Sequence, residues 1–306
     1  MIPPVTDWAS RIGLERALRR TLEDAGAPPV TEISFRKQSH NAVVFHGTCA
    51  DAPVFIKQYQ TDYGPRLVRN TVEETGVVKG LMADGPGGVV DVIWASEPAA
   101  VVIMSAAQGD LLTKTLAAGK AATVMPDVAD WLRRYVGPRV FEDSFSTSYW
   151  LKQRQAMDVT SLSPSDQRLV SGVLELQRGR SAALGRVPVW KGRLPKDFAP
   201  HNLHWDEGAV WGFDIEGYTT AALSRVFVTF CVLAEKILPD SWTRRSGLQD
   251  VAISPFLEAF SAYADPPELL DYQATDLALA RFVQRNGQPE TAQRLRHVLT
   301  EMLELG

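Results

Sequence analysis

The sequence of 306 residues predicts an α+β fold in two lobes, a small antiparallel-sheet N-lobe with one main helix and a larger helical C-lobe that contains a β-hairpin. Three observations lead to this prediction. Short β-prone runs are concentrated before residue 105, helical spacing dominates after residue 109, and one hairpin signal interrupts the helical part. We therefore expect an N-lobe over residues 1–105 and a C-lobe over residues 106–306.

The first part of the chain begins with a predicted helix over residues 8–24. Leu14, Leu18 and Leu22 share one face of this helix, and Asp7 is a plausible N-cap. A second helix is expected over residues 65–82, where Leu67 and Val78 point inward. The predicted strands cover residues 33–35, 43–46, 54–59, 89–94 and 100–104.

The second part is predicted to be helical apart from one β-hairpin. This hairpin pairs residues 203–205 with 210–213 through a turn at Asp206-Glu207-Gly208. The expected helices cover residues 127–135, 148–157, 165–184, 221–237, 255–262, 269–285 and 290–305. A solvated helical surface is expected for Arg244, Arg245, Arg281, Arg285, Arg294 and Arg296.

The composition is that of a globular protein, with 45% hydrophobic and 22% charged residues. A net charge of −4 gives no reason to expect a nucleic-acid partner or an anionic membrane surface. The two cysteines, Cys49 and Cys231, are far apart, which argues against a disulfide framework. The N-terminus lacks the pattern of a signal peptide, and no apolar run is long enough to span a bilayer. We expect a cytoplasmic protein.

The strongest functional pattern surrounds the predicted hairpin. Asp197 is followed by Asn202 five residues later, and Asp214 lies just past the hairpin, in Phe213-Asp214-Ile215-Glu216. Phosphoryl transfer needs one carboxylate to accept or orient a hydroxyl proton, and it needs hard oxygen ligands for magnesium. The pattern predicts Asp197 as the catalytic base and Asn202 with Asp214 as Mg²⁺ ligands.

A candidate nucleotide site precedes this pattern. Lys57 ends the apolar strand Val54-Phe55-Ile56, from which a lysine reaches the α- and β-phosphates of a nucleotide when a helix carboxylate orients it. Glu74 is the predicted partner, because Val78 and Leu81 follow it on the packing face of the same helix. Glu73 remains an alternative.

Two further segments complete the predicted nucleotide site. The loop that contains Ser39 and Asn41 lies between two strands, where its backbone amides could cap phosphates; an ordinary hairpin loop is the alternative. Ser105 and Ala106 follow the last strand of the first part, where an adenine would meet a hinge backbone.

In their order along the chain, these motifs resemble the aminoglycoside phosphotransferase and choline kinase family, relatives of the protein kinases. The resemblance covers about residues 30–235. It implies a protein-kinase-like fold with a five-stranded N-lobe, Mg-ATP as the phosphate donor and a hydroxylated small molecule as the acceptor. Loss of function in Asp197→Asn and Asp214→Ala is expected on this basis.

The sequence departs from the family pattern in two places. Pro195-Lys196 replaces the His-Gly pair that precedes the catalytic Asp, and Arg225-Val226-Phe227 replaces the Asp-Leu-Ala that follows the metal-binding Asp. The first departure leaves open a pseudokinase, which would bind a nucleotide or act as a scaffold. A kinase of a protein or of a lipid-linked sugar is a further alternative. The sequence leaves open amino alcohols, sugars and small hydroxy acids as acceptors, and ATP or GTP as the donor.

Overall fold

A computed structural model describes residues 8–239, 243–284 and 289–305. The chain folds into two compact units: residues 1–109 with 211–218 form the first, and residues 110–210 with 219–306 form the second. The lobe boundary between residues 105 and 106 stays a prediction. In the described part of the chain, no helix is both long enough and apolar enough to cross a membrane.

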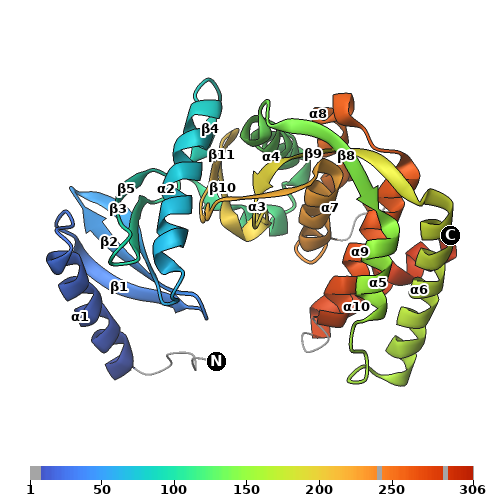
Figure 1. Ribbon diagram of the computed structural model, residues 1–306, viewed down its shortest axis with the longest axis horizontal. Helices are drawn as coiled ribbons and strands as arrows, with labels where there is room; N and C mark the ends of the chain where they lie inside the picture. Colours follow the sequence, from blue (N-terminus) through green and yellow to red (C-terminus); the bar gives the residue numbers. More distant parts are fainter. Residues whose placement is uncertain (1–7, 240–242, 285–288, 306) are drawn as a thin grey trace. The chain divides into compact units, whose positions relative to one another are not determined.

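An antiparallel sheet of five strands forms the centre of the first unit, in the order β1-β2-β3-β6-β5 (Figure 1). The predicted sequence of helix, strands, helix and strands is confirmed. Up to residue 105 the elements are α1 (Trp8–Asp24), β1 (Thr31–Gln38), β2 (Ala42–Cys49), β3 (Ala52–Tyr59), α2 (Gly64–Leu81), β4 (Gly87–Val89), β5 (Val92–Ser96) and β6 (Val101–Ser105).

The two helices of this unit cover opposite faces of the sheet. Alternate residues of a strand point to opposite faces, so Ile103 of β6 packs in one cluster with Leu18 of α1. Its neighbour Val102 packs in a second cluster with Leu67 of α2. Lys57 is paired with Val102 in the β3–β6 register and therefore lies on the α2 face.

The strand predicted over residues 89–94 is divided into β4 and β5. Hydrogen bonds explain the division: Val90 N donates to Gly212 O at 3.0 Å, whereas Asp91 N donates to Ser105 Oγ at 2.9 Å. Adjacent residues thus bond to two different segments, and the chain changes direction between them.

The second unit is mainly helical, as predicted. From residue 110 onward the elements are β7 (Asp110–Leu111), α3 (Leu112–Ala117), α4 (Ala121–Val136), β8 (Val140–Ser146), α5 (Thr147–Gln155), α6 (Pro164–Leu184), β9 (Arg186–Pro195), η1 (Pro200–Asn202), β10 (Leu203–Asp206), β11 (Ala209–Gly212), β12 (Tyr218–Ala222), α7 (Leu223–Ala234), β13 (Arg244–Arg245), β14 (Leu248–Gln249), α8 (Asp250–Ala259), η2 (Ser261–Tyr263), α9 (Pro267–Gln284) and α10 (Pro289–Leu305). The predicted hairpin is confirmed, with β10 and β11 as neighbours.

The expectation of a single β segment in this part was wrong. Strands β8, β9 and β12 form a three-stranded sheet, in which β8 and β9 are antiparallel with Phe145 opposite Val187. Polar residues in β8, and Pro188 and Gly192 in β9, hide the strand pattern in the sequence. Because β12 extends to Ala222, α7 begins at Leu223 rather than at residue 221.

Two helices begin earlier than expected. The prediction started each helix at a proline or just after it, whereas the structure places that proline in the second turn. Helix α4 begins at Ala121 and contains Pro126, and α8 begins at Asp250 and contains Pro255. A proline so close to the N-terminus removes one backbone hydrogen bond without ending the helix. The predicted end of α9 at Arg285 lies outside the described residues.

Candidate functional site

Lys57 joins β3 to a segment more than 150 residues later in the sequence. Its Nζ forms ion pairs with Asp214 Oδ1 and Glu216 Oε1, all three residues lying in the first unit. The Lys57 side chain is buried, whereas the two carboxylates are about one-quarter exposed. The ammonium therefore holds two acidic side chains at the α2 face of the sheet.

The backbone around Asp214 explains this arrangement. Phe213 packs against the hydrophobic cluster on the α2 face, which anchors the segment. Asp214 follows with a φ of 63°, in the left-handed region that Asp tolerates better than bulkier residues. Asp214 and Glu216 are two residues apart and both contact Lys57.

The electrostatics of Lys57 reflect these contacts. Burial by itself would lower the pKa of Lys57, but the charge of Asp214, followed by Tyr59 and Glu216, raises this pKa above the ordinary lysine value. The Lys57 ammonium also lies 5.3 Å from the centroid of the Tyr59 ring. Lys57 is therefore charged at neutral pH.

Glu74 occupies the buried face of α2, with 5% of its surface exposed. Glu73, the alternative partner, is exposed on the same helix. The ion pairs described for Lys57 are with Asp214 and Glu216. A pairing between Lys57 and Glu74 stays a prediction, which burial on the α2 side of the sheet favours for Glu74 over Glu73.

The predicted phosphate loop connects β1 to β2 and uses part of its own hydrogen-bonding capacity. Ser39 Oγ accepts from Asn41 N at 3.4 Å and from Ala42 N at 3.1 Å. The side-chain oxygen of Asn41 accepts from Tyr63 OH at 2.9 Å. The loop is thus a closed hairpin turn, and phosphate binding by Ser39 and Asn41 stays a prediction.

The predicted hinge residues are tied to neighbouring strands. Ser105 N donates to Asp91 O at 2.9 Å, and Ala106 N donates to Pro53 O at 3.1 Å. Ser105 ends β6, so both residues leave the sheet with their backbone positions fixed. Contact between this backbone and an adenine stays a prediction.

The predicted catalytic loop lies in the second unit, between β9 and β10. Asn202 ends the short helix η1, and its Nδ2 donates to the backbone oxygen of Asp197 and to Asp197 Oδ2, each at 3.0 Å. Asn202 is buried, whereas 63% of the Asp197 side chain is exposed. Asn202 therefore closes the loop and orients the exposed carboxylate of Asp197, and magnesium binding by Asn202 stays a prediction.

The surroundings of Asp197 favour its ionised form. The interaction with His201, whose Nε2 lies 3.6 Å from Asp197 Oδ2, is the largest cause that lowers the pKa of Asp197. Burial opposes this shift, while the Asn202 amide and the positive charge of Arg281 on α9 add to it. Asp197 is a carboxylate at neutral pH, which a proton acceptor requires.

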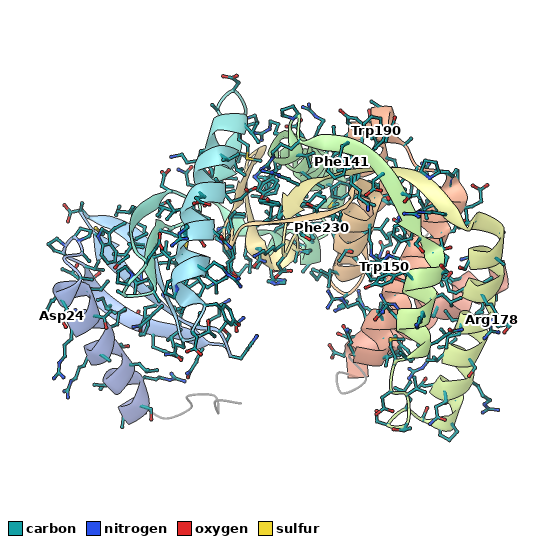
Figure 2. All side chains as sticks on the ribbon, in the orientation of Figure 1. Asp24, Phe141, Trp150, Arg178, Trp190 and Phe230 are labelled. Atoms are coloured by element: carbon teal, nitrogen blue, oxygen red, sulfur yellow. The ribbon has the colours of Figure 1, made fainter. Side chains whose placement is uncertain are left out.

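An aromatic cluster anchors the loop in which Pro195-Lys196 replaces a His-Gly pair. Phe198 is 5% exposed and stacks on Trp131 of α4 with ring centroids 5.9 Å apart and planes inclined by 4°. Phe230 of α7, labelled in Figure 2, and Phe256 of α8 complete the cluster, at 4.7 Å and 6.1 Å from Phe198. Packing of Phe198 thus fixes the position of its neighbour Asp197.

The second departure from the family pattern places a buried arginine at the start of α7. Arg225 Nη2 donates to Asp276 Oδ2 of α9 at 2.9 Å, and the guanidinium lies 3.5 Å from the centroid of the Trp150 ring on α5. Arg225 therefore braces α7 against α5 and α9.

Two residues that contact the predicted site were given no role from the sequence. Glu216 shares Lys57 with Asp214, and His201 approaches Asp197. Both residues are close in sequence to a predicted site residue: Glu216 lies two positions after Asp214, and His201 lies four positions after Asp197.

Searches with the sequence found no matching protein-family model and no matching curated protein. Solved structures with similar folds exist. Aminoglycoside phosphotransferase APH(4)-Ia superposes with a TM-score of 0.58 at 12% identity, over 95% of this chain and 98% of that chain. Choline kinase LicA from Streptococcus pneumoniae superposes with a TM-score of 0.52 at 11% identity, over 96% and 100% of the two chains.

A ternary complex of APH(2'')-IIa with streptomycin and ATP gives a TM-score of 0.55 at 11% identity, over 99% of both chains. At such identities the likeness establishes the fold. The chain therefore has the protein-kinase-like fold of the aminoglycoside phosphotransferases and choline kinase, which confirms the fold implied by the sequence motifs.

Proposed function

We propose that this protein is a phosphotransferase that moves the γ-phosphate of Mg-ATP to a hydroxyl group of a small molecule. The observation that carries this proposal is the buried Lys57 in contact with Asp214 and Glu216. A strand lysine beside the acidic segment that follows a hairpin is the arrangement by which kinase-like enzymes hold nucleotide phosphates and their metal.

In this proposal the residues of the first unit bind the nucleotide. Lys57 holds the α- and β-phosphates, and Glu74 orients the lysine when a nucleotide is bound. Ser39 and Asn41 cap the phosphates, and the backbone at Ser105 and Ala106 receives the adenine. The fold is shared with proteins solved in complex with ADP or with ATP.

The donor atoms fit magnesium. Asp214 supplies a carboxylate beside a second one on Glu216, and Asn202 has an amide oxygen that its contacts with Asp197 leave free. These are the hard oxygen ligands that Mg²⁺ prefers. When bound, the ion supplies positive charge that offsets the charge on the phosphates.

The exposure and the lowered pKa of Asp197 support the catalytic step that we assign to it. The carboxylate orients the acceptor hydroxyl and accepts its proton, while Asn202 and the anchored Phe198 keep Asp197 in place. A bond forms between the acceptor oxygen and the γ-phosphorus, and the bond from that phosphorus to the bridging oxygen breaks, which releases ADP. Catalysis consists mainly of positioning and charge neutralisation.

A pseudokinase is the second candidate, and the replacement of His-Gly by Pro195-Lys196 favours it. Against it, the aromatic cluster around Phe198 provides another means of holding the loop. The pseudokinase hypothesis predicts that the protein binds a nucleotide but does not turn it over.

Calorimetry with Mg-ATP tests the proposal on the wild type and on Asp214→Ala, with and without magnesium. We expect binding that requires magnesium and is lost in the variant. Absence of binding in the wild type would reject the phosphotransferase. Binding to both proteins, regardless of magnesium, would reject the role of Asp214.

A further inference from the structure

Two acidic side chains of one short segment share the ammonium group of Lys57. Its Nζ contacts Asp214 Oδ1 and Glu216 Oε1; the lysine side chain is 11% exposed, whereas the two acidic side chains are 28% and 27% exposed. One oxygen of each carboxylate therefore already contacts a cation, although solvent reaches both side chains. A metal ion that used these two oxygens would have to displace the ammonium group, because two cations so close together repel each other.

The acidic segment is held in place by groups other than Lys57. Phe213 packs in the hydrophobic cluster on the α2 face, and Ile215 is 6% exposed. Asp214, with a φ of 63°, and Gly217, with a φ of 99°, fix the course of the backbone before and after Glu216. The two carboxylates should therefore stay close to each other when the lysine moves away.

A third acidic side chain lies on the side of the sheet that Lys57 faces. Lys57 and Tyr59 are alternate residues of β3 and point to the same face, with Nζ 5.3 Å from the ring centroid. Tyr59 OH lies 3.3 Å from Thr71 Oγ1 of α2, which packs beside β3 (Figure 1). Glu74 follows Thr71 by three residues on this helix, and both are buried. The surface of α2 that carries Glu74 thus faces the strand that carries Lys57.

We propose that Lys57 blocks the binding of a divalent cation to Asp214 and Glu216 until a nucleotide is bound. The inference rests on the proposed function, in which the nucleotide phosphates bind Lys57. Phosphate oxygens are strong partners for an ammonium group, and Glu74 lies on the helix surface that faces the strand of Lys57. When the ammonium group turns to the phosphates, the two carboxylates are released. The metal ion then binds together with the nucleotide rather than before it.

Binding of the nucleotide and binding of the metal are coupled in this scheme through one side chain. Each ligand makes the other bind more tightly by the same factor, since a coupling free energy is reciprocal. Without a nucleotide, a metal ion must break two ion pairs of a buried ammonium group, which weakens its binding. A purely structural role for these ion pairs gives a different expectation: loss of Lys57 would lower the stability without any gain in metal affinity.

Binding of Mn²⁺ in the absence of a nucleotide tests the inference. Mn²⁺ takes the same kinds of oxygen ligand as Mg²⁺, and electron paramagnetic resonance measures its free concentration. The proteins are the wild type, Lys57→Met, the double variant Lys57→Met/Asp214→Ala, and Lys79→Met. The last is the matched control, because Lys79 forms an exposed ion pair with Asp91 in the same unit. Circular dichroism and urea unfolding check the fold of each sample.

We expect the dissociation constant for Mn²⁺ to fall about tenfold or more in Lys57→Met, as for the removal of a neighbouring positive charge. The affinity of the same variant for Mg-ATP should change in the opposite direction. The double variant should lose the gain, which would assign it to Asp214, and Lys79→Met should match the wild type. Lys57→Gln, which keeps a polar side chain, should show the same gain and replaces Lys57→Met where the latter does not fold.

Two results would overturn the inference: Mn²⁺ binding to the nucleotide-free wild type as tight as to the folded Lys57 variants, or a gain in affinity that persists in the double variant. Calorimetry with Mg-ATP on the wild type separates this failure from failure of the proposed function. Normal Mg-ATP binding without a gain in Mn²⁺ affinity rejects the inference alone. Absence of Mg-ATP binding rejects the phosphotransferase, and the inference with it.

Discussion

Lys57 and Asp214 are 157 positions apart in the sequence, yet they form an ion pair inside the first unit. The pair joins the central strand of the sheet to the acidic segment that follows the hairpin. Glu216 contacts the same ammonium, so Lys57 neutralises one of two adjacent carboxylates. Removal of Lys57 should therefore lower the nucleotide affinity and leave the two carboxylates without their shared cation.

Lys57→Met should weaken Mg-ATP binding about tenfold or more, because a buried cation that holds phosphates is lost. Calorimetry with Mg-ATP measures the change in affinity. Lys79→Met is the matched control, because Lys79 forms an exposed ion pair with Asp91 in the same unit. Equal losses in the two variants would show that the effect is nonspecific.

Asp197→Asn should lower kcat by about 100- to 10,000-fold, the range for removal of a general base, and should leave Mg-ATP binding intact. Single-turnover kinetics and calorimetry measure the two properties on the same sample. A kcat within twofold of the wild-type value would remove Asp197 from the mechanism.

His201→Leu should raise the pKa of Asp197, because the hydrogen bond from His201 contributes most to lowering it and leucine has no donor to replace that bond. The direction of the pH dependence follows from the lowered pKa of Asp197. A carboxylate with a depressed pKa stays ionised until the pH falls below its ordinary value of 3.8, so its function is lost only in acid. The variant should lose the ionised form at a higher pH. A carbon-13 NMR titration of Asp197 measures the change, and an unchanged or lower pKa would contradict it.

Some of these relationships were visible in the sequence, and others required the fold. The approach of Asn202 to Asp197 follows from five residues of local chain, and the hairpin after it has clear turn chemistry. By contrast, the pairing of Lys57 with Asp214 depends on how a sheet and a distant segment pack. Strands β8 and β9 were missed for a related reason, since their pairing compensates for polar residues, Pro188 and Gly192 in strands with weak local preference.

The anchoring of the catalytic loop likewise became visible only in three dimensions. In the sequence, the missing His-Gly pair indicated a loop without its usual brace. In the structure, Phe198 packs between helices that are separate in the chain. No local pattern predicts such a cluster, because its members come from α4, α7 and α8.

Phe198→Ala should destabilise the protein by about 3–5 kcal/mol, the usual cost of removing a buried phenylalanine side chain. The milder Phe198→Leu should remain folded and lower kcat about 10- to 100-fold, because a small displacement of the neighbouring Asp197 is enough to impair catalysis. Phe141→Leu is the control, since Phe141 is 45% exposed on β8. Urea unfolding and steady-state kinetics measure both quantities. A wild-type kcat in Phe198→Leu would show that packing at this position does not position Asp197.

Asp276→Asn should be strongly destabilising, because it removes the carboxylate shared by two buried arginines. Arg154 and Arg225 would then repel each other in a poorly hydrated site, at a cost of about 3–5 kcal/mol. The matched change Asp143→Asn breaks a solvent-accessible pair with Lys191 and should have a much smaller effect on stability. Urea unfolding at two salt concentrations compares them. Added chloride should restore part of the stability lost in Asp276→Asn, because an anion can screen the two arginines. Equal losses of stability in both variants would show that the buried charges are not coupled through Asp276.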